Sequence, residues 1–194
     1  TFHNWAEQLS GAHAEAVDVC NLLATQCGAA GTTLLEHEAA SKKAVVEAMA
    51  ESTYIHLATH GEPDGVLLSG ATKAEGKLSM SEVQALRLHQ AQLVVLSECD
   101  SFKGKLYTDG VVGIARAFVA AGALSMLASL WKVDDTATRV LMMGFYDRLL
   151  NKDKAAGDAA LALQGTMVSM LRNYTVLEWA SFVCYGLSTL GSGG

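Results

Sequence analysis

Apolar runs alternate with amphipathic segments along this chain, which predicts strands and helices in turn. Residues 54–60 and 93–98 begin as nearly continuous apolar runs and predict buried strands, as do residues 124–130. Helical spacing of apolar residues predicts helices over residues 11–26, 41–49, 79–88, 111–121, 136–150 and 156–172. Strands that alternate with helices favour a doubly wound α/β fold, with a mostly parallel sheet covered by helices on both faces.

Local signals place several element ends. Gly28 is a stop for the first helix, Ser79 and Glu82 form a capping box, and Asp135 can cap the helix over 136–150. Residues 32–35 are β-prone, residues 66–68 fit one arm of a small hairpin, and residues 176–187 fit a final strand.

Composition indicates one compact domain. The chain has 194 residues, of which 51% are hydrophobic and 18% charged, with a single proline. We expect residues 1–10 to be a linker, 11–188 the domain and 189–194 a flexible Gly/Ser tail. The chain starts without methionine, so we expect it to be a piece of a larger protein.

A net charge of −6 without a Lys/Arg cluster argues against nucleic-acid binding. The apolar stretch 111–131 contains Arg116 and breaks at Gly122, which favours a helix and a strand over a membrane span.

The four cysteines, Cys20, Cys27, Cys99 and Cys184, are too few for a disulfide scaffold in a chain of this length. They predict reduced thiols in an intracellular compartment. No CxxC pair, His-Cys cluster of metal spacing, phosphate loop or dinucleotide fingerprint is present, so we predict no metal and no cofactor.

Two reactive side chains follow two of the predicted strands. His60 ends the first apolar run and Cys99 ends the second. The carboxyl edge of a parallel sheet is where such folds carry out chemistry, so the two residues form a candidate Cys-His nucleophile pair. A lone cysteine after a strand is more often a small buried hydrophobe, and the shared placement of both residues is what favours the catalytic interpretation.

Other polar residues are weaker candidates. His56 is expected on the same face as His60, more as a hydrogen-bonded core histidine than as a site residue. Asp134 and Asp135 fit either a cationic-substrate contact or a helix cap with a first-turn acid. The remaining histidines have no evident partner: His3, His13, His37 and His89.

Four motifs in order resemble the CHAT domain, a caspase-like module related to caspases and separase and often attached to tetratricopeptide repeats. They are residues 58–61 (Ala-Thr-His-Gly), 96–99 (Leu-Ser-Glu-Cys), 109–118 and 128–135. The resemblance implies a caspase-like three-layer α/β/α sandwich with a mostly parallel central sheet. It also implies a cytoplasmic cysteine endopeptidase with catalytic Cys99 and His60, and backbone N–H groups of Gly61 and Cys99 as oxyanion donors.

The substrate implied by the resemblance is a protein. Asp134 and Asp135 are expected to meet a basic P1 side chain; Glu98 is a third candidate, although strand alternation would point it away from the face of Cys99. Glu98 and Phe102 depart from the family pattern around the cysteine. A catalytically inactive caspase-like interaction module therefore stays an alternative. A flavodoxin-like signalling domain would need an acidic metal pocket or a phosphate loop, and the sequence has neither.

Overall fold

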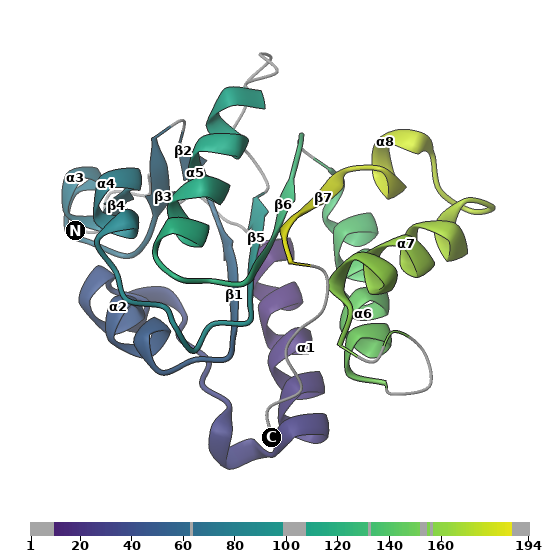
Figure 1. Cartoon of the computed structure of the whole chain (residues 1–194), viewed down its shortest axis with the longest axis horizontal. Coiled ribbons are helices and arrows are strands. Elements are labelled where there is room, and N and C mark those ends of the chain that lie inside the picture. Colours follow the sequence, from purple (N-terminus) through teal and green to yellow (C-terminus); the bar gives the residue numbers. More distant parts are fainter. Residues whose placement is uncertain are drawn as a thin grey trace.

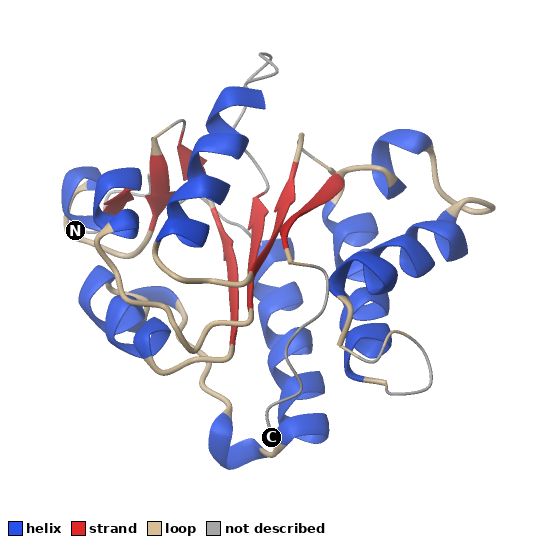
Figure 2. Ribbon diagram, in the orientation of Figure 1, coloured by secondary structure: helices blue, strands red, loops and turns tan. Residues whose placement is uncertain are grey.

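The computed structural model of the chain describes residues 10–62, 64–98, 108–131, 133–151, 155 and 157–187. Within them, a four-stranded sheet lies between two layers of helices (Figures 1 and 2). Its strands run in the order β1-β5-β6-β7, where the bounds are β1 Tyr54–Thr59, β5 Leu93–Glu98, β6 Ser125–Ser129 and β7 Phe182–Gly186. The first three strands are parallel, and β7 pairs antiparallel with β6. The predicted caspase-like α/β/α sandwich with a mostly parallel sheet is confirmed.

Strand β5 lies at the centre because its sequence can be buried on both faces. Its residues from Leu93 to Leu96 are at most 1% exposed, and β1 and β6 pair with it on either side. A continuous apolar run is typical of a parallel strand with helices above and below.

Alternate residues of the strands belong to two separate cores. On one face, Leu93 and Val95 pack with the helices α1 Ser10–Cys27, α6 Asp135–Leu150 and α7 Ala159–Met170. On the other face, Val94 and Leu96 pack with the helices α2 Lys42–Ala50, α4 Met80–Gln84 and α5 Thr108–Ala120. The alternation follows from the two-residue period of a strand.

A second, three-stranded antiparallel sheet follows directly after β1. Its order is β2-β3-β4, with bounds β2 Gly61–Glu62, β3 Gly65–Leu67 and β4 Lys77–Ser79. The predicted hairpin arm over residues 66–68 is confirmed for residues 66 and 67, which lie in β3, whereas residue 68 follows the strand. The short helix α3 Lys73–Gly76 leads into β4, and the capping box of Ser79 and Glu82 starts α4 as predicted.

Four local predictions need correction. Residues 32–35 form no strand but connect two short 3-10 helices, η1 Ala29–Gly31 and η2 His37–Ala39. Their β-prone composition alone does not make a strand, since a strand needs a paired neighbour. Helix α4 ends at Gln84, well before residue 88. Asp134 rather than Asp135 caps α6. Residues 176–187 begin with the helix α8 Val176–Trp179, since Thr175 and Glu178 form a capping box, and only the second half is strand β7.

Most of the predicted linker and the whole predicted tail lie outside the described residues, so those boundaries stay predictions. Among the described residues, no helix is both long and apolar enough to cross a membrane.

Candidate functional site

The pairing of β1 with β5 brings two strand ends to one edge of the sheet. The register runs from Tyr54 opposite Leu93 to Thr59 opposite Glu98. The next residues along the chain are His60 after β1 and Cys99 after β5. Cys99 lies outside the described residues, so the dyad stays a prediction that the register of the two strands supports.

The backbone at His60 is anchored by the small sheet. The Leu67 N–H group donates to the His60 carbonyl at 2.9 Å, and the Thr59 hydroxyl donates to the Leu67 carbonyl. Gly61 is buried and pairs with Val66. His60 therefore lies where two sheets meet, with its main chain positioned by both. Sites supported by such paired strands are better positioned than sites on free loops.

A groove of about 1580 Å³ runs beside β1, and His60 is one of its lining residues. Residues of α1, of the segment 30–40, of α2 and of β1 line most of the rest, together with residues 51–53 and 67–70. Within the described part of the chain, β1 is an edge strand of the four-stranded sheet, with β5 as its one neighbour in that sheet. The volume of the groove exceeds the about 300–1,000 Å³ of typical pockets for drug-sized ligands.

His56 is a hydrogen-bonded core residue, as the sequence favoured. Its Nε2 atom lies 2.9 Å from Oε1 of Glu15, and its Nδ1 atom lies 3.2 Å from the Tyr146 hydroxyl. Burial raises the pKa of Tyr146 well above its usual value, and the charge of Glu15 raises it further. The network joins β1 to α1 and α6, four residues before His60.

The three candidate substrate-binding residues differ in their surroundings. Asp134 is exposed, and its carboxylate accepts hydrogen bonds from the N–H groups of Thr136 at 2.9 Å and Ala137 at 3.3 Å. Asp135 is in the first turn of α6 and lies against Gly11, where a Cβ atom would be 2.1 Å from its Oδ2 atom. Glu98 ends β5, and its side chain lies outside the described portion of the chain. The cap and first-turn acid foreseen as an alternative are thus both present.

The described cysteines Cys20, Cys27 and Cys184 are all free thiols. Burial raises the pKa of the Cys184 thiol, and the nearby charge of Asp158 adds to the shift. A raised pKa lowers the thiolate fraction and so the reactivity. Cys184 is thus poorly suited to be a nucleophile, in agreement with its predicted structural role.

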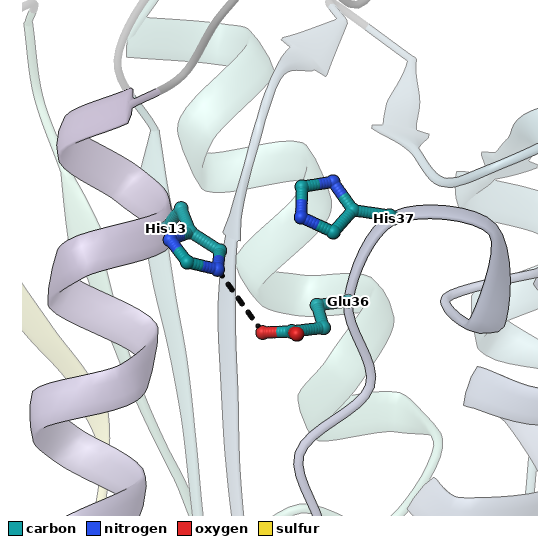
Figure 3. Close-up of side chains that lie close together, drawn as sticks. All are labelled: His13, Glu36 and His37. Carbon is teal, nitrogen blue, oxygen red and sulfur yellow. Dashed lines mark hydrogen bonds and ion pairs between the residues drawn. The ribbon is translucent and has the colours of Figure 1, made fainter.

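One cluster of side chains that can bind metals was not predicted from the sequence. His13 from α1 meets Glu36 and His37 from the segment before α2, and the three side chains point toward one another (Figure 3). Contrary to the expectation from sequence, His13 has a partner, since its Nε2 atom lies 3.1 Å from Oε2 of Glu36. The only available signal was the adjacent pair of Glu36 and His37. Nothing in the sequence spacing linked that pair to His13, which lies 23 residues before Glu36.

Comparison with known proteins agrees with this architecture. The sequence model of the CHAT domain family matches residues 2–187. Tetratricopeptide repeat protein 28 of Mus musculus is 35% identical over 109 residues, and the human protein of that name is equally similar. The matched segment is 56% of this chain but only 4% of each relative. This chain therefore corresponds to a small part of those much longer proteins.

Proposed function

This chain belongs to the CHAT domain family, and on that premise we propose that it is a cysteine endopeptidase with a catalytic dyad of Cys99 and His60. The observation that carries the proposal is the in-register parallel pairing of β1 and β5, since the dyad residues directly follow the paired residues Thr59 and Glu98. Parallel strands deliver the residues that follow them to one edge of the sheet, where ligands bind in folds of this class.

In the proposed reaction, the Cys99 thiolate attacks the carbonyl carbon of the scissile peptide bond. The new C–S bond gives a tetrahedral oxyanion, which collapses to a thioester as the C–N bond breaks. His60 holds the proton released by the thiol and gives it to the departing amine. Water then adds to the thioester with His60 as the base, and the carboxylic acid and the free thiol are regenerated.

The proposed oxyanion donors are the backbone N–H groups of Gly61 and Cys99. Gly61 lies in β2, directly after His60, so a donor there would be close to the general base along the chain. One such donor is typically worth about 10²–10³ in rate.

For the substrate, we propose a protein segment with a basic P1 side chain, which Asp134 and Asp135 would attract, with Glu98 as a third acidic group. Support comes from the exposure of Asp134 and from the net charge of −6. The capping bonds of Asp134 do not neutralise its charge, since they are accepted from uncharged N–H groups. Fluorogenic peptides that differ only at P1 test this proposal, and equal rates for Arg, Lys, Leu and Asp at P1 would contradict it.

We further propose that a tetratricopeptide-repeat or other regulatory domain controls this domain within a parent protein. Two relatives are named as tetratricopeptide repeat proteins, which supports this arrangement. A cytoplasmic location is proposed on the free thiols of Cys20, Cys27 and Cys184, because a reducing compartment keeps such thiols unpaired.

The proposed activity is tested with a peptide library and the variants Cys99→Ala, His60→Ala and Cys184→Ala. We expect cleavage by the parent chain and by Cys184→Ala, and none by the two dyad variants. Equal cleavage by Cys99→Ala would refute the dyad. If the parent chain cleaves nothing and Cys99 reacts with a thiol probe no faster than Cys184, the domain is an inactive interaction module instead.

A further inference from the structure

The cluster of His13, Glu36 and His37 provides three metal-ligand groups from two separate segments. One ligand atom from each side chain lies within 4.8 Å of the others. His13 belongs to α1, whereas Glu36 and His37 lie in the segment before α2, which runs beside α1 in Figure 3. All three residues line the groove. The fold therefore assembles a donor set that is absent from the linear sequence.

The identities of the donors select the class of cation. Two imidazoles and one carboxylate are a known three-ligand set for zinc that leaves one position for water. Imidazole also suits copper and nickel, while magnesium and calcium prefer oxygen ligands. An exposed His-Glu ion pair alone would need neither the second histidine nor its approach to the first.

One ligand-to-ligand distance is already close to what zinc needs, and the ligand atoms of all three residues lie within 4.8 Å of one another. Zinc bonds of about 2.0–2.2 Å place tetrahedral ligand atoms about 3.3–3.5 Å apart. His13 Nε2 and Glu36 Oε2 are already 3.1 Å apart. The rings of His13 and His37 are stacked, with centroids 5.3 Å apart and an angle of 27° between their planes. All three residues are exposed, and their ligand atoms have to close from at most 4.8 Å to the spacing that zinc needs.

The backbone of His37 is also unusual. Its φ angle is 49°, and it is the one non-glycine residue with positive φ among the described residues. This left-handed conformation is unfavourable for most residues with a Cβ atom, although histidine adopts it more often than most. The ring of this residue lies stacked near that of His13 (Figure 3).

We propose that His13, Glu36 and His37 bind a divalent transition metal, with Zn²⁺ as the best fit, and that the metal ties the segment before α2 to α1. Both segments line the groove that also contains His60. Binding would hold two walls of this groove at a fixed separation. The proposal does not depend on the peptidase activity.

Zinc affinity is measured by competition with a chromophoric chelator. All proteins in this experiment carry the Cys99→Ala substitution as a background, because a Cys-His dyad can itself bind zinc. Three variants each remove one ligand. His13→Ala introduces a residue that favours a helix, and Glu36→Gln keeps the shape of the side chain. His37→Asn introduces a residue that tolerates the left-handed backbone conformation. The matched control is His89→Ala, which removes another exposed histidine.

We expect one equivalent of Zn²⁺ to bind with Cys99→Ala alone and with the His89→Ala control. Each ligand variant should bind at least about tenfold more weakly, since even outer-shell partners of a metal are worth about 10–100-fold in affinity. Zinc should raise the melting temperature of the Cys99→Ala protein more than that of each ligand variant at the same zinc concentration. Mg²⁺ and Ca²⁺ at the same concentration should do neither.

Three results would overturn the proposal. The first is no zinc binding to the Cys99→Ala protein. The second is an affinity that all three ligand variants leave within twofold of the control, while circular dichroism shows them folded. The third is a thiolate-to-metal charge-transfer band when Co²⁺ replaces zinc, which would assign the metal to a cysteine such as Cys27 at the end of α1.

Discussion

Glu15 on α1 and His56 on β1 form a hydrogen-bonded pair in the protein interior. The Glu15 Oε1 and His56 Nε2 atoms are 2.9 Å apart, and the two side chains are 2% and 7% exposed. This pair attaches the first helix to the strand that leads to His60.

Removal of His56 should therefore be costly. His56→Ala leaves the buried Glu15 carboxyl without its partner, for which we expect a loss of about 3–5 kcal/mol in the free energy of unfolding. Tyr146→Phe removes only the hydroxyl that lies 3.2 Å from the other ring nitrogen, and should cost about 1 kcal/mol. Urea unfolding of both variants measures the difference. Equal losses would show that the pair with Glu15 is not the dominant contact.

Glu82 should make the stability depend on pH in the acid range. Its hydrogen bond with Lys42 is the largest cause that lowers its pKa from an ordinary value of 4.5 to about 2, and its hydrogen bonds with Ser79 contribute further. Between these two values the unfolded chain binds more protons than the folded one, so stability rises with pH. This contribution is complete above about pH 5 and disappears as the pH falls toward 2.

Replacement of Glu82 by Gln should make the slope of the unfolding free energy against pH shallower over this range. Lys42→Met should do much the same, because Lys42 is the largest cause of the shift. Unfolding curves measured at half-unit steps of pH test both variants. A slope identical to that of the parent chain in Glu82→Gln would rule out this carboxyl as the source.

Gly65 permits a close approach of strands beside the candidate site. A Cβ atom there would lie 2.4 Å from the Leu78 carbonyl oxygen, a backbone atom that cannot swing aside. Gly65→Ala should cost about 1–3 kcal/mol. It should also slow any peptide cleavage, since β3 anchors the backbone of His60 through Leu67.

Gly31→Ala is the matched control for Gly65→Ala, since nothing lies within 4 Å of the position of its Cβ atom. Its effect should stay within about 0.5 kcal/mol. Thermal unfolding of both variants compares them directly. An equally stable Gly65→Ala chain would mean that the two strands separate without cost.

The two proposed roles of Asp134 can be separated by two substitutions. Asp134→Ala removes both cap and charge and should cost about 0.5–2 kcal/mol, whereas Asp134→Asn keeps a good cap and should be nearly neutral in stability. If the charge attracts a basic P1 side chain, Asp134→Asn should lower kcat/KM for Arg peptides but not for Leu peptides. An unchanged Arg-to-Leu ratio would leave Asp134 with its capping role alone.

Sequence patterns predicted the sheet well because its strands depend on long apolar runs. The run from Leu93 to Leu96 is typical of a strand that is buried on both faces by helices. Two incorrect predictions, the start of the last strand and the cap of α6, have local causes. The residues after Thr175 are β-prone, but the capping box with Glu178 favours a helical turn before the strand. The cap of α6 shifted by one residue because two adjacent aspartates offer equivalent side chains.

Site residues that directly follow a strand could be predicted from the sequence. Site residues that meet only because distant segments pack together could not. The position of His60 follows from the length of β1. The meeting of His13 with Glu36 requires α1 and the segment before α2 to pack side by side, which no local pattern encodes. The role of Cys99 stays a prediction, because that residue lies outside the described portion of the chain.

Alkylation of the individual thiols at about pH 6 tests the proposed dyad most directly. Iodoacetamide labelling followed by peptide mapping compares Cys99 with the exposed Cys27 in the parent chain and in His60→Ala. An activated thiolate has a lowered pKa. The dyad therefore predicts that Cys99 reacts faster than Cys27 and that His60→Ala abolishes the advantage. A Cys99 that reacts no faster than Cys27, with a rate unchanged in His60→Ala, would contradict it.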